Sequence, residues 1–279
     1  MEKRKMKPGA FFRRYFRIIV SGTILTCVIL VAIFADVIAP IDPYATDMYN
    51  INLRPGTDGH RFGTDMYGRD IFSRVVHGTG ISIGISFIVS VLSIVIGTCM
   101  GLFVGFYRWA DQIIMRFLEG WAAMPDLILT LTLITILGTG VDKVIIAMVV
   151  SRVTGICRLV RQQVLSLREK EFVECAKASG ASNLRIMFKY ILPQCVSPLI
   201  IRFTTGLGGG IMGLASLAFL GVGIDPRIPS WGGIINEGRN TVMVYPYQCA
   251  YAGVAIMITV LAFSILGDAL RDILDPRLR

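Results

Sequence analysis

Long apolar runs alternate with short polar stretches along the whole of this 279-residue chain. A helix needs about 20 apolar residues to cross a bilayer, and it must satisfy its own backbone hydrogen bonds because lipid offers no partners. Six runs approach that length, at 18–39, 81–106, 115–138, 143–162, 197–220 and 249–268. A single water-soluble core would instead give shorter amphipathic segments. The pattern therefore predicts an all-α, polytopic membrane protein with six transmembrane helices.

Basic residues gather in two places, and their positions predict the topology. Lys and Arg crowd 1–17 and again 163–196, whereas basic and acidic residues nearly balance in 40–80 and 221–248. Short loops rich in Lys and Arg stay on the cytoplasmic side of a membrane. The N-terminus is therefore predicted to be cytoplasmic, and six spans return the tail 269–279 to the same side. The same count puts the basic loop inside and the two balanced segments outside, in agreement with their charge.

Composition supports a membrane environment and argues against nucleic-acid binding. Hydrophobic residues make up 54% of the chain, the mean hydropathy is +0.64, and only 17% of residues are charged, against about 25% in soluble domains. The net charge is +9, but both basic clusters flank apolar spans, so topology and anionic lipid account for them. The six cysteines form no CxxC pair. We expect small buried residues there, with no disulfide framework and no metal site.

The first apolar run also has features of a cleaved signal peptide, because a basic stretch precedes it. However, it extends from Ile18 to Ala35, lacks an Ala-x-Ala-like exit and leads into Asp36. Such a run is long for the apolar region of a signal peptide. A retained first transmembrane helix at 18–39 is therefore predicted.

Small residues recur at three- and four-residue spacing in two of the predicted spans. The first stripe consists of Ser86, Ser90, Ser93, Gly97, Gly101 and Gly105, and the second of Gly206, Gly209, Gly210 and Gly213. Such faces let helix backbones approach closely in a membrane. The spacing does not tell whether the opposite helix belongs to this chain or to another subunit, so both alternatives stay open.

Three charged residues within the predicted spans are candidates for a transport path. Glu119 and Asp126 lie seven residues apart in the third predicted span, hence on one helix face, and Arg152 lies inside the fourth. Charges at this depth are costly and often line such a path. Alternatively, Glu119 lies near the headgroups and Asp126 bonds backbone groups freed by Pro125. Arg152 is either a partner of the two acids or a snorkelling side chain, and Arg202 is predicted to be a snorkelling anchor.

The segment 168–193, REKEFVECAKASGASNLRIMFKYILP, is too polar to cross a membrane but has helical periodicity. Its predicted stripe consists of Phe172, Val173, Ala176 and Ser179. Gly180 interrupts the pattern, Ser182 or Asn183 can cap a second short helix, and Pro193 lies where the next span begins. We expect a helix–turn–helix on the cytoplasmic face with an uncovered stripe. This element either rests on lipid or docks into a groove of a soluble partner.

The same segment resembles the EAA loop of bacterial ABC importer permeases. That pattern is Glu-Ala-Ala, three residues, Gly, nine residues, Ile, one residue and Leu-Pro. In this chain Cys175 replaces the central Ala and Tyr190 replaces the Ile. The resemblance implies that 170–190 contains a coupling helix inserted into a groove of a cytoplasmic ATPase subunit. The candidate coupling residues are Glu174, Cys175, Ala176, Gly180, Ala181, Leu192 and Pro193.

Motifs elsewhere resemble the dipeptide, oligopeptide and nickel branch of these permeases. They are His60-Arg61-Phe62-Gly63-Thr64-Asp65 with Gly68-Arg69-Asp70 and Ser73-Arg74, Phe219-Leu220-Gly221-Val222-Gly223 with Pro229-Ser230-Trp231-Gly232, Glu237-Gly238-Arg239, and the tail motif Leu274-Asp275-Pro276-Arg277. The resemblance implies a type I permease core of five helices at 81–268, preceded by one extra span, in the bacterial inner membrane. It also implies a second homologous permease, two ATPase subunits and an extracytoplasmic binding protein. Peptides are the favoured substrate, with nickel, a metal chelate or a glutathione-like compound as alternatives.

The sequence lacks the signatures of other classes. There is no P-loop pattern GxxxxGK[ST], so we expect ATP and Mg²⁺ to be bound by partner ATPases, with no cofactor in this chain. The metalloprotease motif HExxH does not occur. His60 and His77 are isolated, so a structural role is expected for each and no metal site is predicted. An ATP-independent channel or a membrane sensor would need a repeated filter or a soluble output domain, and neither pattern is present.

Overall fold

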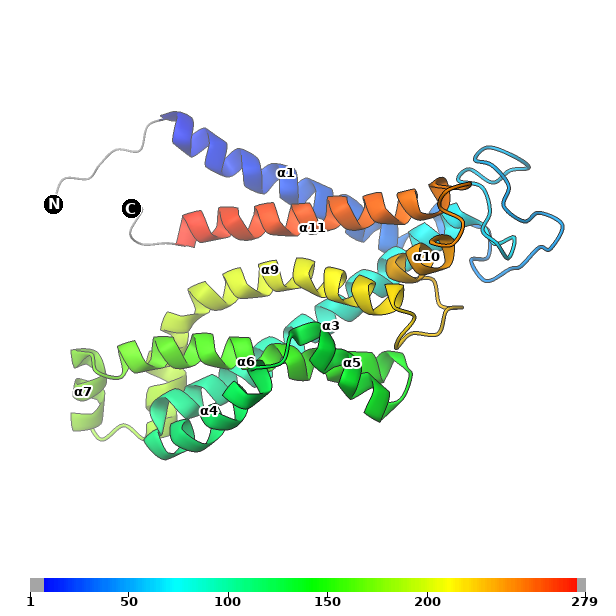
Figure 1. The fold of residues 1–279 in the computed structure, drawn as a ribbon. Helices are drawn as coiled ribbons and strands as arrows, with labels where there is room; N and C mark the ends of the chain where they lie inside the picture. Colours follow the sequence, from blue (N-terminus) through cyan, green and yellow to red (C-terminus); the bar gives the residue numbers. More distant parts are fainter. Residues whose placement is uncertain (1–7, 275–279) are drawn as a thin grey trace.

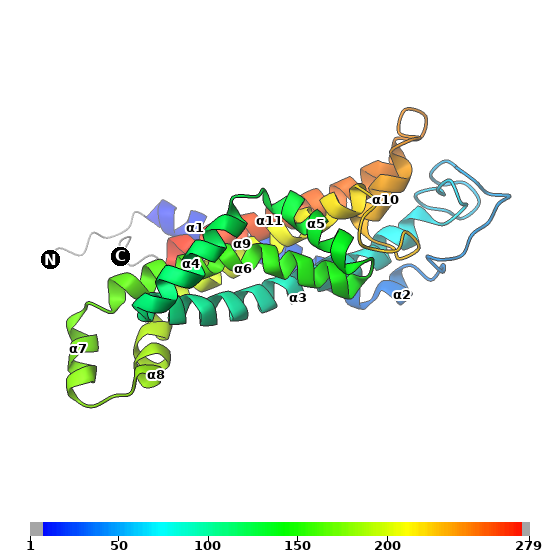
Figure 2. The same ribbon diagram turned by 60° about the horizontal axis from the view of Figure 1, so that its bottom comes forward.

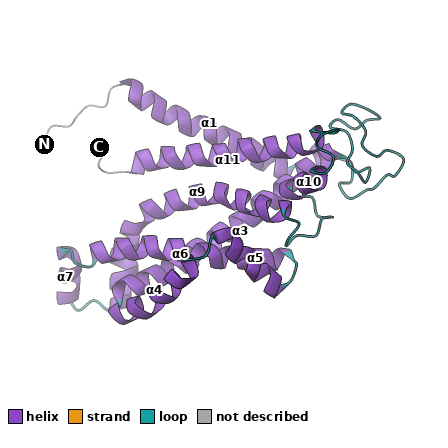
Figure 3. Cartoon of the chain, in the orientation of Figure 1, coloured by secondary structure: helices purple, strands orange, loops and turns teal. Residues whose placement is uncertain are grey.

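The computed structural model describes residues 8–274, and these residues form long helices joined by turns (Figures 1 and 3). The long helices are α1 (Pro8–Ile33), α3 (Ile71–Phe106), α6 (Val141–Leu167), α9 (Leu192–Phe219) and α11 (Tyr247–Leu274). The shorter ones are α2 (Ala35–Ile38), α4 (Arg108–Ala122), α5 (Asp126–Leu137), α7 (Glu171–Ala178), α8 (Asn183–Arg185), the π-helix η1 (Ile186–Ile191) and α10 (Trp231–Gly238). The predicted all-α class is confirmed.

The long helices run side by side, and the molecule has two distinct ends (Figure 1). α3 packs along α6, α9 packs against α11, and α1 lies on α11. One end holds α7, the start of α1 and the end of α11, where Arg17 lies 4.0 Å from Asp272. The opposite end holds the segment 39–70 and α10. The basic loop and the two helix ends therefore share one side, as the topology prediction requires.

The apolar helices expose most of their surface to the surroundings. Four helical stretches are each long and apolar enough to cross a membrane: α1, α3, α8 with η1 and α9 together, and α11. Only 11% of the most apolar window of α1 and 28% of that of α11 is buried within the chain. Large apolar faces left uncovered in this way belong in lipid. The fourth predicted span corresponds to α6, which is more polar because it carries Arg152, Arg158 and Arg161.

The third predicted span is not one helix, which corrects the sequence analysis. α4 ends at Ala122, α5 begins at Asp126, and the two helices are bent by 94° at this break. Pro125 has no backbone N–H and disfavours the helical conformation of Met124, so the helix stops before it. Glu119 and Asp126 consequently lie on different helices and not on one face.

α3 begins ten residues before the predicted span at 81–106. The Asp70 side chain caps it by accepting a hydrogen bond of 2.7 Å from the Ser73 N–H, and Ile71 at its first turn is buried. A helix of 36 residues is about 54 Å long at 1.5 Å per residue. This length exceeds the roughly 30 Å hydrocarbon core, so the α3 end near Asp70 projects beyond the apolar layer.

Both stripes of small residues pack inside this chain, which answers the question that their spacing left open. A Cβ added at Gly101 would lie 2.6 Å from the Val160 Cβ and 2.7 Å from the Cys157 carbonyl oxygen. Gly97 and Gly105 meet α6 in the same way. Nearer the start of α3, the Ser86 hydroxyl of the same stripe donates a 2.7 Å hydrogen bond to the Leu207 carbonyl of α9. α3 thus packs against both α6 and α9.

Candidate functional site

α7 is held against the bundle by its inner face. Val173 is fully buried and Ala176 is 6% exposed. They join an apolar cluster with Leu102 of α3, Val164 of α6 and Ile191 of η1. The expected uncovered stripe is therefore wrong in part, because this chain covers Val173 and Ala176 itself. This cluster therefore joins α7 directly to α3, α6 and η1.

The outer face of α7 is exposed and mixed in character. Phe172, Glu174, Cys175 and Lys177 all lie on the surface. In Figure 2, α7 and α8 project beyond the ends of the long helices. This face is therefore open to contact with another molecule.

Gly180 ends α7 with a Schellman motif. The Gly180 N–H donates to the Lys177 carbonyl at 2.9 Å, and the Ala181 N–H donates to the Ala176 carbonyl at 3.0 Å. Gly180 has φ of +76°, and an added Cβ would meet nothing within 4 Å. The position therefore requires glycine for its left-handed backbone and not for lack of space.

The chain after Gly180 enters α9 without a second turn. Ser182 caps α8, since its hydroxyl accepts from the Arg185 N–H at 3.4 Å. α8 then continues through η1 into α9. The second short helix is thus confirmed, but it is continuous with the next span. Leu192 is half-buried and Pro193 is exposed, and both lie inside this continuous helix, where Pro193 was expected to mark a new start.

A polar cavity of about 350 Å³ lies between α3, the α4–α5 break, α6 and α9. Asp126 and Arg152 line it, as does Arg202, which was expected to be an anchor at the membrane surface. Glu119 does not line it and is exposed on α4, near Arg161. A second cavity of about 170 Å³ adjoins it and shares Asp126 and Arg152. These two residues therefore lie at the junction of two cavities along α6 and α9.

The arginines of the cavity are seated against glycines. Arg152 donates a 2.9 Å hydrogen bond from Nη1 to the Gly206 carbonyl, and its Nη2 lies 3.2 Å from a Cβ added at Gly209. The Arg202 Nη2 lies 3.3 Å from a Cβ added at Gly155. The Arg152 guanidinium thus extends from α6 to α9, and the Arg202 guanidinium extends from α9 to α6.

Several buried polar atoms around the cavity have no hydrogen-bond partner within the described residues. They are the hydroxyl oxygens of Ser90, Ser93 and Thr154 and the indole nitrogen of Trp121. A buried polar group without a partner costs about 1–3 kcal/mol. Such groups gathered around one cavity are suited to contact water or a polar solute.

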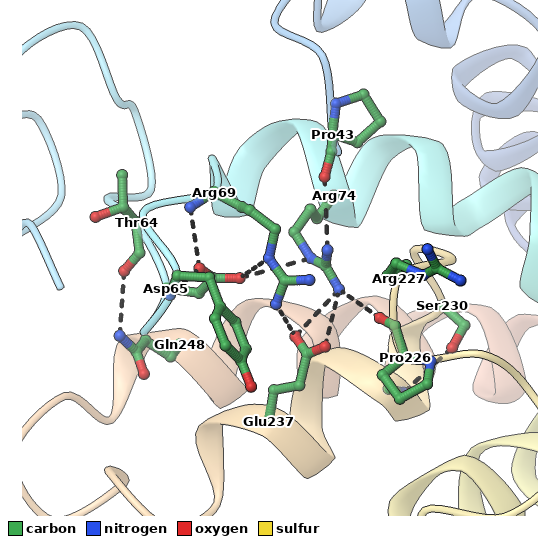
Figure 4. A network of polar contacts seen from close by, with 12 residues as sticks. Pro43, Thr64, Asp65, Arg69, Arg74, Pro226, Arg227, Ser230, Glu237 and Gln248 are labelled. Carbon is green, nitrogen blue, oxygen red and sulfur yellow. Dashed lines mark hydrogen bonds and ion pairs between the residues drawn. The ribbon is translucent and has the colours of Figure 1, made fainter. Parts of the chain in front are cut away.

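A buried ionic network joins the two segments at the opposite end of the molecule (Figure 4). Arg69 binds Asp65 through Nε at 2.7 Å and Glu237 through Nη2 at 2.7 Å, and Arg74 binds Glu237 at 3.1 Å. Burial raises the pKa of Glu237, and the two guanidinium groups oppose that shift. Sequence reasoning did not assign these roles, although all four residues occur in the motifs quoted above, because nothing in those motifs indicates that they meet.

The long apolar helices, the polar cavity between them and the projecting α7 define a membrane transport protein. The family model described as "Binding-protein-dependent transport system inner membrane component" matches residues 93–279, and a model for the N-terminal transmembrane domain of oligopeptide transport permease C matches residues 12–55. The chain belongs to this family of inner-membrane transport components.

Relatives match over nearly the whole length of both chains. The dipeptide transport system permease protein of Alkalihalophilus pseudofirmus is 38% identical over 94% of this chain and 86% of its own. A glutathione transport system permease protein of Escherichia coli O157:H7 is 40% identical over 96% of this chain and 89% of its own. A glutathione transport system permease protein of Pectobacterium atrosepticum is 36% identical over 96% of this chain and 91% of its own.

Proposed function

We infer that this chain is the permease subunit of an ATP-driven, binding-protein-dependent importer of short peptides. The observation that carries the proposal is the seating of α7. Its exposed face bears Glu174 and Cys175, while Val173 and Ala176 are embedded in a cluster shared with α3, α6 and α9. A helix built in this way transmits a push or pull from outside the bundle to its interior. The dipeptide relative supports peptides as the substrate.

The proposal includes a defined set of partners. α7 docks on a cytoplasmic ATPase subunit, and a second homologous permease, identical or distinct, offers its own coupling helix to a second ATPase. These ATPases bind ATP and Mg²⁺, so hydrolysis is not a property of this chain. Both termini and α7 lie in the cytoplasm. The opposite end, held together by Arg69, Arg74 and Glu237, receives an extracytoplasmic binding protein.

The mechanism follows from these contacts. Closure of the ATPases on ATP moves α7, and the apolar cluster passes this movement to α6 and α9, which form the cavity walls. Those walls then separate on the outer side, and the binding protein releases its substrate between them. Asp126 and Arg152 belong to the proposed translocation path because they line the cavity. Glu119 is left out because it does not.

Glutathione is the second candidate substrate, because two of the relatives described above carry that name. Glutathione is itself a short peptide with two carboxylates, so the two proposals share much of their chemistry. The two candidate substrates are distinguished with the purified transporter and its binding protein. The true substrate should stimulate ATP hydrolysis and enter proteoliposomes, and the other compound should do neither.

The docking role of α7 is tested by Glu174→Lys in the complete reconstituted transporter. Reversing this exposed charge should weaken the ATPase contact, so that ligand-stimulated ATP hydrolysis and peptide uptake both fall about tenfold or more, as buried interfacial charge pairs do on disruption. The variant should still enter the membrane in normal amounts. Asp268→Lys is the matched control, because Asp268 is an exposed acid on the last turns of α11 and away from α7. Equal uptake by both variants would contradict the docking role.

A further inference from the structure

The polar cavity carries an excess of positive charge. Arg152, Arg158 and Arg202 line it, and within the described part of the chain Asp126 is the one carboxylate among its lining residues. None of the three arginines has a described carboxylate within 4.0 Å. Arg152 is partly buried in this cavity, whereas Arg158 and Arg202 are exposed on its wall. A guanidinium at membrane depth is costly unless a counter-charge arrives, so this arrangement points to an anionic ligand group.

The geometry leaves guanidinium donors free for such a group. A guanidinium has five N–H donors in a planar fork that matches the two oxygens of a carboxylate. Arg152 is described with one side-chain hydrogen bond, to the Gly206 carbonyl. Arg202 has no described side-chain hydrogen bond, and its Nη2 lies 3.3 Å from the place where a Cβ at Gly155 would be. The positive charges of Arg152 and Arg202 repel each other, and the Asp126 carboxylate attracts Arg152.

Buried hydroxyls from α3 and α6 line the same cavity. Ser90 is 3% exposed, Ser93 is 1% exposed and Thr154 is 5% exposed, and the hydroxyl of each lacks a described partner. These groups can bond the peptide carbonyl and amide of a solute held by its charged ends. A cavity of about 350 Å³ also falls in the range of sites for small molecules, roughly 300–1,000 Å³.

We propose that this cavity recognises the free carboxylate of its substrate through Arg202 and Arg152, with Asp126 facing the ammonium group. The proposal rests on the function inferred above and names the chemical feature that the permease itself selects. A dipeptide presents one carboxylate and one ammonium group. The cavity should therefore discriminate against a peptide whose carboxylate is amidated, even after the binding protein has delivered it.

Arg202→Gln is the informative variant, because Arg202 has no described side-chain hydrogen bond that the fold would lose. Uptake of Ala-Phe and of Ala-Phe amide is measured in proteoliposomes with the complete transporter, and each probe is loaded to saturation on the binding protein. Removing a charge-assisted hydrogen bond of this kind typically costs about tenfold. We expect Arg202→Gln to lower Ala-Phe uptake about tenfold and to leave amide uptake within about twofold. Arg202→Lys should restore part of the Ala-Phe uptake.

The remaining arms of the experiment separate this proposal from its competitors. Arg116→Gln is the matched control, since Arg116 is exposed on α4 and does not line the cavity; it should change neither uptake rate. If Arg202→Gln lowers both peptides by one factor, the arginine serves packing or a lipid phosphate and the proposal is wrong. It is also wrong if neither rate changes. If the wild-type transporter imports neither probe and its ATP hydrolysis does not respond, the inferred function fails instead.

Discussion

At the scale of single residues, Gly180 illustrates a requirement that comes from the backbone alone. Its φ of +76° is open to glycine, and space around its Cα is free. A residue with a Cβ pays about 1–2 kcal/mol in this conformation, and Asn suffers less than a β-branched residue because its short side chain bonds locally. The identity of residue 180 therefore sets how firmly α7 ends and how its exposed face is aimed.

Gly180→Val and Gly180→Asn make this requirement testable. The valine variant should strain the Schellman motif and lower peptide uptake several-fold, while the amount of protein in the membrane stays normal. The asparagine variant should retain most of the uptake, because it tolerates the left-handed backbone. Both are measured as uptake per ATP hydrolysed in proteoliposomes. Equal loss in the two variants would mean that residue 180 acts through its size and not its conformation.

At the scale of elements, close packing of α3 on α6 depends on glycines that only the structure could assign to a partner. The spacing of Gly97, Gly101 and Gly105 was visible in the sequence, but the same stripe would serve a contact with another subunit equally well. The contacts with Val160 and Val164 settle that α6 of the same chain lies opposite. Periodicity identifies a face, whereas the partner of that face depends on the whole fold.

Gly101→Ala tests this packing. The new methyl group would lie 2.7 Å from the Cys157 carbonyl, a backbone atom that cannot swing aside. Overpacking of this kind typically costs about 1–3 kcal/mol, so the thermal midpoint of the detergent-solubilised protein should fall. Gly84→Ala, on the same helix with nothing within 4 Å, should be neutral or slightly stabilising because alanine favours helix over glycine. If Gly101→Ala is as stable as Gly84→Ala, the helices are less tightly joined than described.

The break between α4 and α5 shows where sequence reasoning about elements falls short. Hydropathy is continuous from 115 to 138, so a single span is the simplest prediction, and Pro125 alone does not decide it because prolines occur inside membrane helices. Pro198, unlike Pro125, lies inside a helix that continues unbroken, α9. Neighbouring helices decide which proline interrupts a helix, and a single sequence does not describe those neighbours.

At the scale of the whole molecule, segments far apart in sequence meet at both ends. The EAA-like loop could be placed from the sequence because its residues are contiguous and its side of the membrane follows from charge. The buried ionic network at the opposite end could not be placed from the sequence, because Arg69 and Arg74 meet Glu237 only after folding. Two of the three candidates named from the sequence, Asp126 and Arg152, line the cavity, whereas Glu119 lies on α4 before the helix break and does not.

The central claim is that α7 is a cytoplasmic contact for an ATPase subunit, and Cys175 offers a direct measurement of it. This thiol is exposed on α7, whereas Cys157 and Cys195 are buried and serve as internal controls. A membrane-impermeant maleimide is applied to inside-out and right-side-out vesicles, and labelling of Cys175 is followed by mass spectrometry. Cys175 should be labelled only in inside-out vesicles, and bound ATPase subunits should protect it at least several-fold. Labelling from the outer side, or equal labelling with and without the ATPase, would contradict the account.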